Sequence, residues 1–305
     1  MSKEKVSQTK VISDERAYTR ALIERIVREC PARRAASEDE RKAMEIVAAE
    51  FEKLGLGTEM KPFLFNQSLY ANIALHFGVA SLGTLIGGLM PKTALALHSL
   101  AVGSYYADST RKGYLLRRAF PFKPSQNLLA VSPAKTGEPK LRIVLAAHAD
   151  AAFTGLIFSD FVVKNLAGEP PKALKFMKRQ MEFTMKSTAS LIGFDALRAV
   201  VGPLAAPLRP IEYMLTIPAF LAFLLNMQVV LQNEIVPGAN DNLSGVVAEL
   251  VLAARLLANQ PDDVEYVFAI TGCEEASLGG ADALAREMEA HWPRHNTVVL
   301  GLDSL

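Results

Sequence analysis

Three apolar runs in this chain each end in acidic or histidine side chains, and this pattern constrains the fold more than any other feature. Nearly continuous apolar runs of this length are typical of strands that are covered on both faces of a sheet. Helical patterns lie between the runs, and such alternation predicts an α/β fold with a mostly parallel, doubly wound sheet. The runs are Leu141–Ala147, Val264–Thr271 and Thr297–Leu302.

The polar residues that follow these runs form a candidate site, because ligands of open α/β sheets gather outside the carboxyl ends of the strands. A further carboxylate, Asp241, lies in the turn Pro237–Gly245 just before an apolar helix, where the alternative is a simple helix N-cap. One imidazole and several carboxylates in one crevice would repel each other, and a divalent cation would resolve this. Nitrogen and oxygen ligands without thiolates suit zinc, manganese or cobalt. The residues after the runs are His148, Asp150, Glu274, Glu275 and Asp303.

Each of these residues also has a simpler interpretation. His148 could be a core histidine, although a strand end with Asp150 two residues later favours a ligand. The pair Glu274-Glu275 could be the solvated start of a helix. Cys273 has no basic neighbour in the sequence, so a packed thiol is expected there rather than a nucleophile.

Composition excludes several classes of protein. The formal net charge of the 305 residues is only +1, which gives no electrostatic reason to expect nucleic-acid binding. Two cysteines provide neither a disulfide framework nor a cysteine-based zinc site. Met1–Arg20 is polar and lacks an apolar segment, so a cleavable secretory signal is not expected.

Two insertions are unusually apolar. Ala71–Met90 contains no Asp, Glu, Lys or Arg, and Ile211–Leu231 contains only Glu212. About 20 apolar residues span the core of a bilayer, so each insertion is expected to form a membrane-crossing, re-entrant or surface-lying helical pair. The basic segment Arg111–Arg118 suits an anionic surface on the cytoplasmic side. The alternatives for the two apolar insertions are buried helices and a homodimer interface. The basic segment Lys172–Lys186 is also expected to be helical.

At these motifs the sequence resembles the zinc aminopeptidases of peptidase family M28. The family pattern is His-x-Asp, a Gly-x-x-Asp-Asn/Asp-x-Ser-Gly turn, Glu-Glu, an Asp after a strand, and a distant histidine. This chain matches the first four motifs in order, and their joint occurrence is specific. The resemblance covers residues 14–65, 125–150 and 235–305. The matching motifs are His148-Ala149-Asp150, Gly238–Gly245, Glu274-Glu275 and Asp303.

The resemblance implies a three-layer αβα fold of the zinc-exopeptidase type and assigns roles to the motif residues. Asp241 would bridge two zinc ions, His148 and Asp303 would complete one of them, and Glu275 would bind the other. Glu274 would be the general base for the attacking water, and Asp150 would orient His148. The implied reaction is the removal of an N-terminal residue from a peptide substrate.

The chain departs from the family pattern at its end. The last histidine of the pattern has no counterpart before Leu305, since His291 and His295 precede Asp303. We therefore expect the sequence to be the N-terminal part of a longer protein, with one or two zinc ions bound.

The expected organisation is a peptidase core interrupted twice. The core comprises residues 1–68, 122–153 and 233–305, and the apolar insertions are residues 69–121 and 154–232. The expected function is a membrane-associated zinc aminopeptidase whose site faces the cytoplasm, or else a cytoplasmic form of it. The alternatives are a non-catalytic scaffold on the same fold and a single-zinc acyl-transfer enzyme.

Overall fold

The computed structural model describes residues 12, 14–162 and 180–305. Most of the helix expected at Lys172–Lys186 lies outside the described residues. The chain divides into two compact units, and each is interrupted in the sequence by the other. The sheet unit consists of Met1–Gln67, Phe122–Ala152 and Ile235–Leu305, and the helical unit consists of Ser68–Pro121 and Phe153–Glu234.

The sheet unit contains a five-stranded sheet with the strand order β1-β2-β4-β3-β5. The three strands that precede the candidate residues are mutually parallel, and β1 and β2 continue the sheet in antiparallel fashion. The predicted α/β class is confirmed, and Pro62 lies in the edge strand β1, where proline is tolerated. The strands are β1 (Gly57–Phe65), β2 (Lys123–Ser132), β3 (Leu141–His148), β4 (Val264–Thr271) and β5 (Thr297–Gly301).

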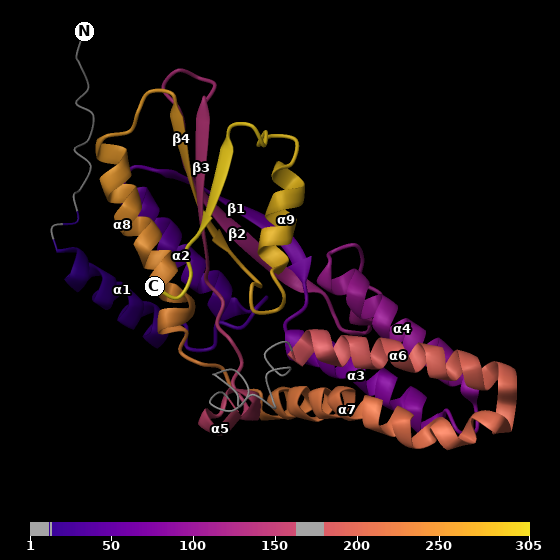
Figure 1. The fold of residues 1–305 in the computed structure, drawn as a ribbon. Helices are drawn as coiled ribbons and strands as arrows, with labels where there is room; N and C mark the ends of the chain where they lie inside the picture. The colour runs from indigo at the N-terminus through magenta and orange to yellow at the C-terminus, as the bar shows by residue number, and fades with distance from the viewer. Residues whose placement is uncertain (1–11, 13, 163–179) are drawn as a thin grey trace, which may run out of the picture. The chain divides into compact units, whose positions relative to one another are not determined.

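Helices cover both faces of this sheet, which gives the predicted three layers (Figure 1). One layer contains α1 (Glu15–Glu29), α2 (Glu38–Lys53) and α8 (Ser244–Ala258), and α9 (Gly279–Met288) lies on the opposite face. The N-terminus of α2 is fixed by Ser37, whose hydroxyl accepts the N–H of Glu40.

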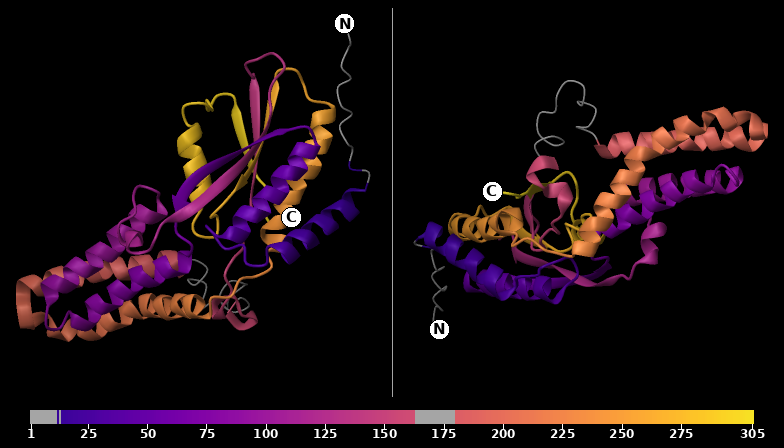
Figure 2. Two further views of the ribbon diagram at one scale, coloured as in Figure 1. Left: turned by 180° about the vertical axis from the view of Figure 1, so that it is seen from behind. Right: turned by 90° about the horizontal axis from the view of Figure 1, so that it is seen from below.

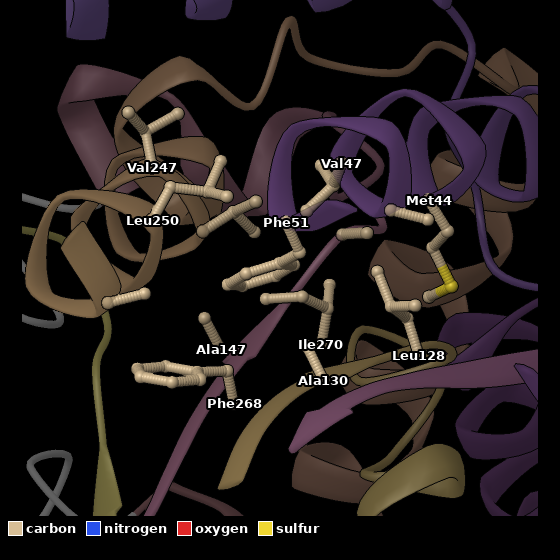
Figure 3. Close-up of a cluster of buried hydrophobic side chains, with 14 of the residues drawn as sticks. Met44, Val47, Phe51, Leu128, Ala130, Ala147, Val247, Leu250, Phe268 and Ile270 are labelled. Carbon is tan, nitrogen blue, oxygen red and sulfur yellow. The ribbon is translucent and has the colours of Figure 1, made fainter. Parts of the chain in front are cut away.

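The main core lies between the sheet and the layer of α2 and α8 (Figure 3). The rings of Phe51 in α2 and Phe268 in β4 are 5.6 Å apart between centroids, and both side chains are fully buried. Burying one such side chain contributes roughly 1.5–3 kcal/mol. Leu250 of α8 completes the layer above β3 and β4. This packing fixes the strands whose ends carry the candidate site.

The helical unit is built from two helical pairs, which Figure 2 shows side by side. Helix α3 contacts α4 and α7, and α6 contacts α4 and α7 in turn, so the four helices form a closed bundle. A short helix, α5 (Asp160–Val162), precedes the second pair. The long helices are α3 (Leu69–Ile86), α4 (Pro91–Ser109), α6 (Gln180–Val201) and α7 (Arg209–Gln232).

Glu249 of α8 gives the sheet unit a testable pH dependence. Its carboxyl group is fully buried, and burial raises its pKa well above the ordinary value. The unfolded chain loses this proton above roughly pH 4.3, whereas the folded chain keeps it, so stability falls as pH rises. Glu249→Gln removes this ionisation. We expect the variant's stability to exceed the wild type's by a margin that grows between pH 5 and 8, by at most about 1.4 kcal/mol per pH unit.

Chemical denaturation at several pH values measures this margin. Glu138→Gln is the control, because Glu138 is exposed in a turn. A margin for Glu249→Gln that does not change with pH would contradict the assignment of a buried, protonated carboxyl group.

Candidate metal centre

His148 lies at the end of β3 and points its two ring nitrogens at different partners. Nδ1 lies 3.1 Å from the main-chain oxygen of Asp150 and 3.5 Å from its Oδ1. Nε2 lies 3.1 Å from Oδ1 of Asp241, 3.8 Å from Oε2 of Glu274 and 4.0 Å from Oδ1 of Asp303. This nitrogen is buried and has no hydrogen-bond partner among the residues that the structure describes. The ring is therefore fixed on one side, and its free nitrogen faces carboxylates.

Asp150 joins this histidine to the loop after β4. Its carboxylate is fully buried. Oδ1 accepts the backbone N–H of Glu274 at 3.0 Å, and Oδ2 accepts that of Glu275 at 2.9 Å. One side chain therefore sets the positions of the predicted general base and of a predicted ligand.

Asp241 lies in a turn that is anchored to the exit of β5. The peptide bond between Asp241 and Asn242 is cis. The side chain of Asn242 donates to the main-chain oxygen of Leu302 at 2.8 Å and accepts the N–H of Ser304 at 3.3 Å. A Cβ atom at Gly245 would lie 2.4 Å from the oxygen of Leu302, so glycine is required there. Asn242 and Gly245 thus hold the Asp241 turn beside Asp303.

Electrostatics around His148 show a shortage of positive charge. Burial alone would lower its pKa, but the hydrogen bond and charge of Asp150, with the charges of Glu274 and Glu275, raise the pKa to about 9. Burial, together with the charges of Asp150, Glu274 and Asp241, raises the pKa of Glu275 to about 8. Burial also raises the pKa of Glu274. The cluster therefore favours an added cation.

The donor set fits a divalent metal. Ligand atoms of His148, Asp241 and Asp303 lie within 4.8 Å of one another, and so do those of His148, Glu274 and Glu275. All the predicted site residues thus lie at one edge of the sheet. A buried imidazole nitrogen without a partner, surrounded by carboxylates, suits zinc. Cys273 is buried, and burial raises its pKa, in agreement with a packed thiol.

Sequence reasoning missed two residues near the site. Arg33 is fully buried beside the loops that carry His148 and Asp241. Glu40 lies in the first turn of α2, and its carboxylate accepts the N–H of Cys273. Burial and the charge of Asp150 raise the pKa of Glu40 to about 8, whereas its three hydrogen-bond donors favour the ionised form. No periodic pattern marks either residue, since their partners are distant in the sequence.

An α/β sheet with a histidine and carboxylates at its strand ends defines a class of metal-dependent enzymes. Within that class, residues 227–305 match the model of peptidase family M28. The matched region contains the turn of Asp241, the pair Glu274-Glu275 and Asp303, and the match agrees with the resemblance seen in these motifs. No curated protein matches the chain.

Several solved structures are similar to the chain over most of its length. They include the aminopeptidase from Aneurinibacillus sp. strain AM-1, at 14% identity over 96% of this chain and 71% of that chain, with a TM-score of 0.48. A second is the glutaminyl cyclase of an Acidobacteriales bacterium, at 12% identity over 99% of this chain and 63% of that chain, with a TM-score of 0.46. A third is a zinc aminopeptidase from Bacillus subtilis, at 14% identity over 94% of this chain and 68% of that chain, with a TM-score of 0.45. The chain thus spans 63% of that cyclase's length.

Zinc binding provides a direct check of the centre. We expect the purified protein to retain zinc and His148→Ala to lose at least one bound ion, because the imidazole is the only nitrogen ligand in either group of donors. Elemental analysis after dialysis measures the stoichiometry. His291→Ala is the matched control, because His291 is exposed beyond α9. Equal zinc content in wild type and His148→Ala would contradict the assignment.

Proposed function

We propose that the sheet unit is a zinc-dependent aminopeptidase that hydrolyses the N-terminal peptide bond of a peptide. The observation that carries this proposal is the partnerless Nε2 of His148, which faces carboxylates from three different loops. Zinc at this position would polarise the scissile carbonyl and lower the pKa of a water. His148, Asp241, Asp303 and Glu275 are the residues that would hold it.

Glu274 is the proton carrier in this proposal. Its carboxylate is partly buried, and Oε2 lies 3.8 Å from the imidazole, next to the group of ligands. The raised pKa favours a carboxyl group that can take a proton from the attacking water and return it to the leaving amine. The carboxylate of Asp150 accepts the backbone N–H of Glu274, and the main-chain oxygen of Asp150 contacts Nδ1 of His148, so both roles depend on one buried residue.

Glu274→Ala separates an enzyme from a scaffold. Loss of general-base catalysis is expected to lower kcat on an aminoacyl-nitroanilide by about 10²- to 10⁴-fold, with the zinc content unchanged. Glu289→Ala, an exposed exchange in the helical turn after α9, is the control. Bound zinc without turnover that depends on Glu274 would favour the scaffold. A peptide with N-terminal glutamine tests the acyl-transfer alternative, because cyclisation releases ammonia whereas hydrolysis releases an amino acid.

We also propose that the helical unit associates with a membrane on its cytoplasmic side. Two stretches, Leu69–Ile86 and Met181–Gln232, are long and apolar enough to cross a bilayer. In the second stretch, only 22% of the apolar 18-residue window that meets this criterion is buried. Large apolar side chains are exposed in the turns between the paired helices, where Leu89 is 93% and Leu204 85% exposed. A surface with many exposed large apolar side chains is typical of a membrane or protein interaction site.

The interior of the same bundle contains buried ion pairs beside its apolar core, which supports a bilayer as the surrounding medium. Nδ1 of His98 lies 2.5 Å from Oδ2 of Asp195, and both side chains are buried. Glu212 is buried between Arg198 and Arg209. Ionisable side chains within membranes face the bundle interior and pair with one another. Exposed large apolar side chains lie on α3, α6 and α7, which favours a lipid environment over a homodimer interface confined to one face of the bundle.

Flotation with lipid vesicles tests this proposal. The wild-type protein is expected to float with anionic vesicles, and the double variant Leu89→Glu/Leu204→Glu is expected to float less, since each charge at bilayer depth costs about 3 kcal/mol. Leu64→Glu is the control, because Leu64 is an exposed leucine of β1 in the sheet unit. A wild-type protein that stays soluble without detergent and does not float would contradict membrane association. A dimer that the double variant dissociates would instead identify the apolar surface as an interface between subunits.

A further inference from the structure

The guanidinium group of Arg33 connects two loops of the candidate metal centre. Nε donates to the main-chain oxygen of Ala149 at 3.1 Å, and Ala149 lies between His148 and Asp150. Nη2 donates to the oxygen of Pro237 at 2.8 Å, at the start of the turn that carries Asp241. Arg33 therefore bridges the loop after β3 and the loop before α8.

Further contacts show that this bridge is built into the fold. The side chain of Arg33 is 0% exposed, and its Nη1 donates to the oxygen of Cys30 at 3.0 Å. The backbone takes part as well, because the N–H of Ala151 donates to the oxygen of Arg33 at 2.8 Å. Gly238 has a φ of +59°, and a Cβ atom there would lie 2.8 Å from Nη2 of Arg33. The turn is thus shaped around the guanidinium group.

Glu40, seven residues later, connects the third loop. Its Oε1 accepts the N–H of Cys273 at 2.8 Å, immediately before Glu274 and Glu275. Its Oε2 accepts the hydroxyl of Ser125 at 2.7 Å and the N–H of Ala36 at 3.0 Å. Together with Asp150, this carboxylate binds three consecutive backbone N–H groups, those of residues 273–275.

We propose that Arg33 and Glu40 are positioning residues of the metal centre, which set the spacing between three of its four ligand-bearing loops, those after β3, before α8 and after β4. This inference rests on the proposed zinc site. Metal binding requires donor atoms at closely defined distances. Substitution of a residue that orients the ligands typically lowers metal affinity or activity by about 10- to 100-fold. Arg33 lies between α1 and α2, and Glu40 lies in the first turn of α2. A part of the chain that contains none of the ligands therefore controls the site.

The chemistry of each side chain explains why a similar residue would not replace it. Arg33 uses three guanidinium nitrogens on carbonyl oxygens in different directions, and the compact ammonium group of lysine has no such planar fork. Glu40 offers acceptors to three donors, whereas glutamine would turn an N–H₂ group toward one or more of them. Conservative variants therefore remove the positioning while they retain most of the volume.

The test uses the protein as purified in detergent and the variants Arg33→Lys and Glu40→Gln. Zinc affinity is measured by competition with a chromogenic chelator, well below the temperature of unfolding, and kcat and KM are measured separately. Each variant is expected to bind zinc about 10- to 100-fold more weakly. With zinc in excess, each is expected to lower kcat more than it changes KM, because the ligands and Glu274 lose their alignment.

Matched controls separate positioning from general stability. Arg28→Lys exchanges an exposed arginine of α1, and Glu38→Gln exchanges an exposed glutamate two residues before Glu40. A lower melting temperature with unchanged zinc affinity in both Arg33→Lys and Glu40→Gln would overturn the proposal, because it would mean a structural role alone. If Arg33→Lys does not fold, Glu40→Gln decides the question.

Zinc affinity and turnover also distinguish the failure of this proposal from failure of the proposed function. Wild-type protein that binds zinc without hydrolysing peptides would contradict the aminopeptidase, while the zinc affinities of the variants would still test Arg33 and Glu40. Wild-type protein that binds no zinc would overturn both.

Discussion

The candidate centre depends on one buried carboxylate, that of Asp150. It is fully enclosed, accepts two consecutive backbone N–H groups from the loop after β4, and lies beside Nδ1 of His148. A buried charge is tolerated only where hydrogen bonds compensate its lost hydration. The loop with Glu274 and Glu275 is therefore constrained to the position that satisfies Asp150, and the carboxylates of the cluster are brought together despite their mutual repulsion.

Buried polar side chains bind different kinds of partner in the two units. In the sheet unit, side chains such as Arg33 and Asn242 bind backbone atoms of loops and so order a site. In the helical unit, charged side chains pair with one another inside the bundle, as Arg117 does with Asp108. The first arrangement positions the backbone that carries function. The second accompanies many exposed large apolar side chains on the outer surface of the helices.

The sequence predicted the strands and the site better than the contacts that hold the site. Apolar runs that precede His148, Glu274 and Asp303 were enough to place these residues at one end of three parallel strands, because the carboxyl ends of parallel strands align. Arg33 and Glu40 escaped prediction because their partners are 116 and 233 residues away and are backbone atoms, which carry no sequence signal. The antiparallel pairing of β2 with β4 could likewise not be predicted from the sequence, since apolar patterns do not encode strand order.

The interruption of the sheet unit by both helical pairs has a consequence for folding during synthesis. β2 pairs with β4, so Leu128 must wait for Ile270 before that part of the sheet can form. Both apolar helical pairs leave the ribosome before β4 and β5 have been synthesised. Contacts between such distant segments form slowly. The helical pairs must therefore reach their final environment before the sheet unit closes, and a nascent chain delayed at this stage exposes its most apolar segments to aggregation.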